Sequence, residues 1–181
     1  MFVPLLSLTT IALSCVVRGL PLKQLAKFGQ YTGGTTGFAS DNVCGDSTFN
    51  RETSSESPLV SDCQGMVDYL KSRDTGWVFY GWDKEHLDSG YAPAAFNATC
   101  TFGVKPIDAN NGPAVMALGD AIDVIRDSIT KFSSDGHVGA SGVMGCQVSP
   151  GDADRLADGG GTEERKFKWQ IYKSGSQPEV W

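Results

Sequence analysis

Five cysteines, in a chain that opens with an apolar run, constrain this fold more than any other feature. Residues 1–17 are predominantly apolar, and this run is short for a membrane span but typical of a secretory signal peptide. We expect cleavage after Gly19. Cleavage after Ser14 and a buried N-terminal strand or helix are the alternatives. Removing residues 1–19 takes Cys15 away and leaves an even number of cysteines, as an oxidised extracellular domain prefers. The remaining cysteines are Cys44, Cys63, Cys100 and Cys146.

Cysteine spacing and net charge argue against several classes of protein. No two cysteines have the C-x-x-C spacing of a redox or zinc motif. A formal net charge of −6 argues against a protein that binds nucleic acid through its phosphates. No second apolar run is long enough to span a membrane. We therefore expect a secreted, extracellular monomer with no stable membrane span, no metal and no cofactor.

The expected domain organisation is an N-terminal arm followed by one folded domain. Residues 20–57 are rich in Gly, Ser and Thr, and residues 31–37 have neither a helical nor a strand period, which predicts a loop. The length of 181 residues corresponds to about one domain. We expect a flexible arm over residues 20–40 and a single domain over residues 41–181.

Two segments have the apolar spacing of amphipathic helices. In residues 57–73, Pro58 suits a first helical turn, and apolar side chains recur at steps of three and four. Residues 121–132 repeat this spacing with isoleucines, and Asp120 is the expected N-cap. The predicted buried stripe of the first helix consists of Leu59, Cys63, Met66, Val67 and Leu70.

Four further segments have the composition or the alternation of β-strands. They are residues 77–82, 98–104, 137–148 and 166–173. Residues 83–96 and 149–165 are expected to be loops. The element order is therefore α-β-β-α-β-β, in which loop-connected strands favour antiparallel pairing and two helices can cover one face. This order predicts an α+β two-layer sandwich with a four-stranded antiparallel sheet, two helices on one face and two disulfides.

Candidate catalytic residues are few. Glu85 and His86, with Asp83, could form the acid–base site of a secreted ribonuclease, and Asp83 with Glu85 could form the carboxylate pair of a glycosidase. His137 opens a predicted strand, and nothing in the sequence brings it near His86. With 21 acidic residues such close pairs arise freely, so solvated or structural side chains are the default interpretation. We predict no catalytic, cofactor-binding or metal site.

Large aromatic residues and one glycosylation sequon are the remaining surface candidates. Trp77 and Trp169 are expected in the core, whereas Trp82 and Trp181 are candidates for an exposed contact with a partner. Asn97 begins an Asn-X-Thr sequon, which predicts N-glycosylation in a secreted chain.

The order of several short segments resembles a known family. These segments are residues 44–49 (CGDSTF), 100–104 (CTFGV), 118–129 (LGDAIDVIRDSI), 136–146 (GHVGASGVMGC) and 169–172 (WQIY). The set is similar to the fungal secreted effectors known as necrosis-inducing factors, which are homologues of an extracellular effector of the tomato leaf mould. The resemblance covers about residues 41–173. It implies a killer-toxin-like α/β sandwich and a virulence factor that provokes plant cell death, and it brings no catalytic residues.

Four cysteines allow three disulfide pairings. We favour Cys63–Cys100, which would join the first helix to the second strand, and Cys44–Cys146, which would tie the leading segment to the third strand.

Three functional hypotheses follow. The first is a secreted effector that acts on an unknown host protein or cell-surface component by binding. The alternatives are a killer-toxin-like antimicrobial that acts on competing cells and a small secreted hydrolase.

Overall fold

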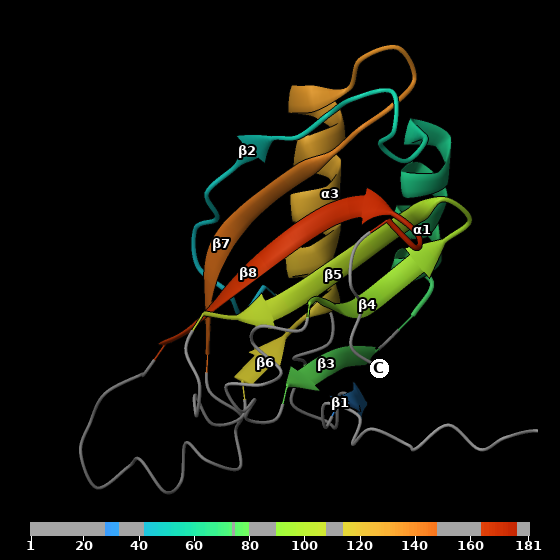
Figure 1. Cartoon of the computed structure of the whole chain (residues 1–181). Coiled ribbons are helices and arrows are strands. Elements are labelled where there is room, and N and C mark those ends of the chain that lie inside the picture. The colour runs from blue at the N-terminus through green and yellow to red at the C-terminus, as the bar shows by residue number, and fades with distance from the viewer. Residues whose placement is uncertain are drawn as a thin grey trace, which may run out of the picture.

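The computed structural model describes residues 28–32, 42–73, 75–79, 90–107, 114–147 and 164–176 (Figure 1). Within these residues two helices and eight strands form an α+β fold. The helices are α1 (Val60–Lys71) and α3 (Leu118–Phe132). The strands are β1 (Phe28–Thr32), β2 (Asn50–Arg51), β3 (Thr75–Phe79), β4 (Ala92–Asn97), β5 (Cys100–Pro106), β6 (Ala114–Met116), β7 (Ala140–Gln147) and β8 (Glu164–Lys173).

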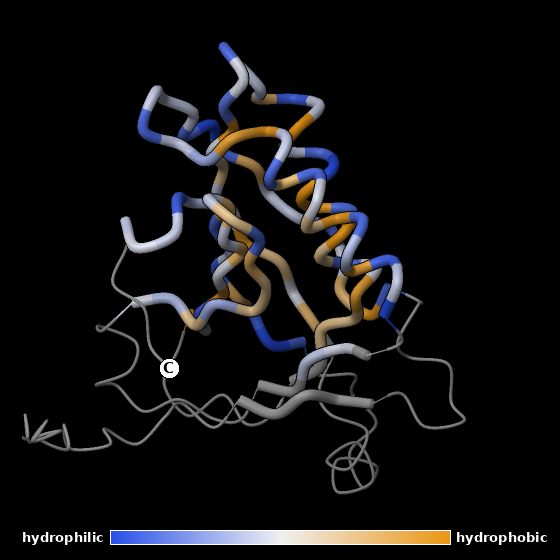
Figure 2. Tube along the Cα trace, turned by 90° about the vertical axis from the view of Figure 1, so that its right-hand side faces the viewer, coloured by the Kyte–Doolittle hydropathy of each residue, from blue (hydrophilic) through white to orange (hydrophobic). Residues whose placement is uncertain are grey.

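The main sheet has five strands in the order β2-β7-β8-β5-β4, and all of its pairs are antiparallel. Seen from the side in Figure 2, both helices lie on one side of these strands. The predicted α+β class, the antiparallel sheet and the two helices are confirmed. The predicted strand count was wrong, because the sheet contains β2 and β4, and the strand expected at residues 77–82 belongs to a second sheet.

Strand β4 occupies residues that we expected to form a loop. Its sequence, APAAFN, is dominated by alanine and proline, which are poor strand formers. Pro93 is tolerated because β4 is an edge strand, and its register with β5 shifts between Pro93 and Ala95. Pairing with β5 through the Ala98–Thr99 turn thus overrides the weak local preference.

The second sheet has the order β1-β3-β6 and is also antiparallel. Strand β1 lies inside the segment that we expected to be an arm, and Phe28 is paired with Phe79, far away in the sequence. Because β1 is held by a partner far away in the sequence, its own residues show no periodicity that would predict a strand. Strand β6 has only three residues and also depends on its partner.

The core lies between the helices and the main sheet. Trp77 and Trp169 are buried in it, as expected, whereas Leu59 precedes α1 as its N-cap and is exposed, contrary to our expectation. Gly142 lies beneath Trp169, where a Cβ atom would come within 2.6 Å of the indole ring and would collide with the Thr48 carbonyl oxygen. The principal core residues are Cys63, Met66, Val67, Leu70, Phe102, Val104, Ala121, Val124, Ile125, Ala140, Met144, Phe167, Trp169 and Ile171.

Candidate functional site

An aromatic groove runs between the end of α1 and the edge strand β4, with a volume of about 360 Å³. Tyr69 from α1 and Phe96 from β4 flank it, with 49% and 65% of their surfaces exposed. The Arg73 guanidinium carbon lies 4.5 Å from the centroid of the Tyr69 ring, and an Arg73 nitrogen also donates a hydrogen bond to the Tyr69 hydroxyl. The other lining residues are Leu70, Trp77, Pro93, Ala94, Ala95, Asn97 and Leu118.

The chemistry of this aromatic groove suits recognition. Its floor is apolar, and its rim carries a phenol, a guanidinium and an amide, which can orient a partner through hydrogen bonds. The stacking of Arg73 on Tyr69 holds both side chains in place, so that less side-chain entropy is lost when a partner binds.

An acidic groove of about 510 Å³ lies at the other side of α3, beside the leading segment and β7. Asp46, Asp123 and Asp127 line it together with Phe49. Lys131 binds Asp127 at 2.6 Å and lies 4.0 Å from the centroid of the Phe49 ring, so it neutralises part of the negative charge.

Asp120 is the buried carboxylate of the acidic groove, and its contacts give it a structural role. It accepts backbone hydrogen bonds from Val43 (3.2 Å), Cys44 (3.1 Å) and Ala117 (2.9 Å). Burial raises the pKa of Asp120 despite these three donors. Our expectation of Asp120 as N-cap was wrong. The N-cap is Ala117, and Asp120 is the third residue of α3, from which it reaches back to the Ala117 N–H.

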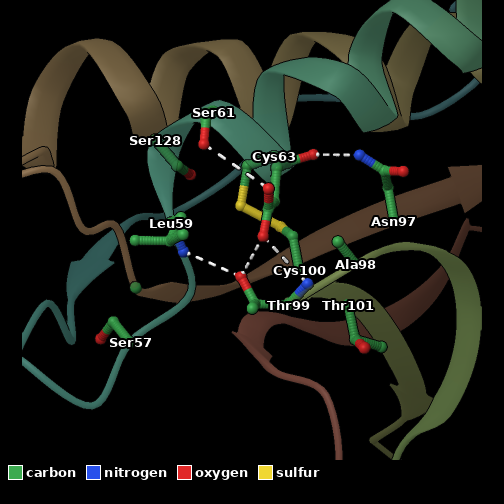
Figure 3. Close-up of a disulfide and its surroundings, with 12 residues drawn as sticks. Ser57, Leu59, Ser61, Cys63, Asn97, Ala98, Thr99, Cys100, Thr101 and Ser128 are labelled. Carbon is green, nitrogen blue, oxygen red and sulfur yellow. Dashed lines mark hydrogen bonds between the residues drawn. A yellow bond between two sulfur atoms is a disulfide. The ribbon is translucent and has the colours of Figure 1, made fainter.

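The Cys63–Cys100 disulfide (S–S 2.00 Å) joins α1 to β5, as predicted. Around it the β4–β5 turn is fastened to the first turn of α1 (Figure 3). The Asp62 carboxylate accepts hydrogen bonds from the Thr99 hydroxyl (2.6 Å) and the Thr99 N–H (3.0 Å). The Asn97 side chain donates to the Asp62 carbonyl oxygen (2.9 Å). We call this set of contacts, made by Asp62, Asn97 and Thr99, the turn latch.

The second predicted disulfide, Cys44–Cys146 (S–S 2.08 Å), is also confirmed. It joins the leading segment to β7 at an isolated antiparallel bridge. Together with Asp120, it fixes the position of the acidic groove's wall.

Several sequence candidates lie outside the described residues. These are Asp83, Glu85, His86, Trp82, Trp181 and the expected signal peptide 1–19. His137 lies within the described residues, in the turn before β7. Its Nδ1 donates a hydrogen bond to the Ser57 carbonyl oxygen (2.8 Å), so the contact of this ring is structural. In the described part of the chain, no group of three or more His, Cys, Asp or Glu side chains could hold a metal ion.

No helix within the described ranges is long and apolar enough to cross a membrane.

The match to known proteins covers the part of the chain that holds both disulfides. A family model described as "Pathogen effector; putative necrosis-inducing factor" (Hce2) matches residues 43–146. The chain belongs to this family of pathogen effectors. The resemblance seen in the short segments is thereby confirmed for the effector family.

Two curated relatives of this effector chain come from Penicillium expansum. "Probable chitinase LysM18" is 30% identical over 131 residues, which is 71% of this chain and 8% of the relative. "Secreted chitinase LysM12" is 27% identical over 133 residues, which is 71% of this chain and 7% of the relative. This effector chain therefore spans less than a tenth of the length of either relative.

Sequence reasoning missed the aromatic groove because it treated the β4 segment as a loop. The sequence did contain one indication of the groove. Tyr69 lies outside the apolar stripe of α1, between Asp68 and the buried Leu70, and this position predicts an aromatic side chain that faces solvent.

Proposed function

We propose that this chain is a secreted fungal effector that acts by binding a host protein or cell-surface component through the aromatic groove, rather than by catalysis. The effector family supports the coarser part of this proposal, and a relative named as secreted supports export. We also propose that residues 1–19 direct export, that residues 20–40 form an arm held to the domain by the pairing of β1 with β3, and that residues 41–181 form the effector domain, which acts as a monomer. Trp82 and Trp181 remain proposed contact residues.

The exposure of aromatic side chains carries the binding proposal. In the described part of the chain three large hydrophobic side chains are exposed, and two of them, Tyr69 and Phe96, flank the same groove. Protein interfaces concentrate their binding energy in aromatic and arginine side chains next to small pockets. Tyr69, Phe96 and Arg73 provide this combination.

The chitinase names of the relatives motivate the alternative of a hydrolase. Because the matched region is less than a tenth of each relative, the name can refer to chemistry performed elsewhere in those long chains. The carboxylates of the acidic groove are where a hydrolase would act, and Asp46, Asp123 and Asp127 are its accessible members. The Asp120 carboxylate is buried and already accepts three backbone hydrogen bonds, so it is not one of the accessible groups.

A double variant, Tyr69→Ser with Phe96→Ser, tests the binding proposal. Hot-spot truncations cost about 2 kcal/mol each, or roughly a 30-fold loss of affinity per residue. We therefore expect purified oxidised double variant, infiltrated into plant leaf, to need at least a roughly 30-fold higher dose than wild type to cause cell death. Leu59→Ser is the matched control, because Leu59 is the third exposed hydrophobic residue and lies outside the groove.

The control should keep wild-type activity, and circular dichroism should show that all three proteins are folded. A double variant with undiminished activity would contradict the binding proposal. Hydrolysis of chitin fragments by the wild type, abolished in Asp46→Asn with Asp127→Asn, would establish the hydrolase instead. Growth inhibition of competing yeast, with no effect on leaf, would favour the antimicrobial alternative.

A further inference from the structure

We propose that the sequon Asn97-Ala98-Thr99 serves as a structural latch, and that this latch and a glycan on Asn97 exclude each other. Folded, secreted molecules then carry an unmodified Asn97, contrary to what the sequon alone predicts, and a glycan reaches this residue only in chains that have not yet closed the β4–β5 turn. This inference does not depend on the binding function proposed above.

The hydroxyl of the sequon is already engaged in the fold. Thr99 Oγ1 donates to the Asp62 carboxylate at 2.6 Å and accepts from the Leu59 N–H at 3.1 Å. The Thr99 N–H donates to the same carboxylate, and the Thr99 carbonyl oxygen accepts from Ser174 N–H at 2.9 Å. Thr99 therefore lies between the beginning of α1 and the end of β8, with hydrogen bonds to both.

The amide nitrogen of the sequon is also engaged. Asn97 Nδ2 donates to the Asp62 carbonyl oxygen, and it lies so close to Gly65 that a Cβ atom there would be 2.6 Å away. The helix surface can approach Asn97 this closely because residue 65 has no side chain. Figure 3 shows Asn97 pointing at the helix.

N-glycosylation changes this nitrogen directly. Asn97 Nδ2 would form a bond to C1 of the sugar of a lipid-linked oligosaccharide, the bond from C1 to the lipid diphosphate would break, and one amide proton would leave. The product carries a bulky glycan on the atom that now lies against Gly65. The nitrogen would have to leave the helix surface, and the latch would open.

Because of the neighbouring disulfide, the outcome depends on whether glycosylation of Asn97 or closure of the turn comes first. Cys100 follows Thr99 directly, and its bond to Cys63 holds the turn beside Asp62. Once this bond has formed, the sequon cannot extend away from the helix. An unpaired Cys63 or Cys100 would leave the turn free and the sequon open to modification.

The test is the occupancy of Asn97 in protein secreted from a fungal host, measured by peptide mass spectrometry after enzymatic deglycosylation in heavy-oxygen water. We expect wild type to be essentially unmodified. Gly65→Ala, which keeps every cysteine, should raise occupancy several-fold by displacing the amide. The pair Cys63→Ser with Cys100→Ser should raise it further.

Two controls make the result decisive. Gly45→Asn creates a sequon with Asp46 and Ser47 on an exposed stretch, where the nearest atom to the new Cβ is 3.6 Å away, and it should be glycosylated by the same host. Asn97→Gln should remove any glycan assigned to Asn97. The proposal is overturned if wild-type Asn97 is as fully occupied as the Gly45→Asn sequon, or if Gly65→Ala leaves Asn97 as unmodified as in wild type.

Discussion

At the scale of single residues, Asp62 orders a turn that lies 37 positions further along the chain. Its carboxylate accepts hydrogen bonds from both the hydroxyl and the N–H of Thr99, and its carbonyl oxygen accepts one from the Asn97 side-chain amide. The two hydrogen bonds from Thr99 lower the pKa of the Asp62 carboxyl below its ordinary value of 3.8, the hydroxyl more than the N–H. Because the Thr99 hydrogen bonds favour the ionised form of Asp62, the stability that the turn latch contributes depends on pH.

Asp62→Asn is expected to flatten the dependence of stability on acid pH. Because the pKa of Asp62 is lower in the folded state than in the unfolded chain, its contribution is complete above about pH 4 and is lost as the pH falls through the folded-state pKa. Urea unfolding of wild type and variant, repeated from neutral to strongly acidic pH, measures this. Asp68→Asn is the control, since Asp68 is an exposed residue of α1 paired with Lys71 (3.7 Å). Equal flattening in both variants would refute the assignment.

At the scale of elements, Asp120 connects α3 to the leading segment. Asp120→Ala removes one buried acceptor from three N–H groups, and hydrogen bonds to charged groups contribute about 1.5–3 kcal/mol each before the cost of burial is subtracted. We expect a net loss of about 2–3 kcal/mol in the free energy of unfolding. Hydrogen exchange of the Val43 and Cys44 amides should accelerate in the same variant.

Asp123→Ala is the matched control for this experiment. Asp123 lies on the exposed side of α3, where it accepts one bond from Asn42 (2.8 Å) and lies 4.0 Å from Arg126. Its loss should cost less than about 1 kcal/mol. An equal cost for the two variants would mean that Asp120 does not anchor the leading segment.

The sequence predicts some elements and not others, and the difference is physical. Both helices and β8 have a periodicity of their own: in β8, Phe167 and Trp169 are buried while Lys166 and Lys168 are exposed. Strands β1 and β4 depend on partners, so local sequence does not reveal them. The aromatic groove lies beside β4, so the sequence offered only Tyr69 as a sign of it and did not reveal its second wall. The disulfide pairing was accessible because each bond joins elements that were correctly assigned.

At the scale of the whole molecule, the two disulfides close loops of different length. The cysteines are separated by 102 positions in Cys44–Cys146 and by 37 in Cys63–Cys100. The loop-entropy model assigns about 5 and about 4 kcal/mol to them. These values are comparable with the entire stability of a small domain.

Replacing each pair by serines should therefore lower the urea midpoint strongly, with the larger loss for Cys44 and Cys146. Urea unfolding followed by tryptophan fluorescence measures both losses, and Trp169 in the core provides the signal. A larger loss for the Cys63 and Cys100 pair would show that contacts of the turn latch outweigh loop entropy.

The central position of β8 has a consequence for how the protein is made. Of the described strands this one comes last in the sequence, yet it lies between β7 and β5. As the chain is synthesised, the β4–β5 hairpin and the Cys63–Cys100 bond can assemble first, but the two halves of the sheet stay apart until β8 is available. Until that point the protein consists of two incomplete half-sheets, and β8 unites them.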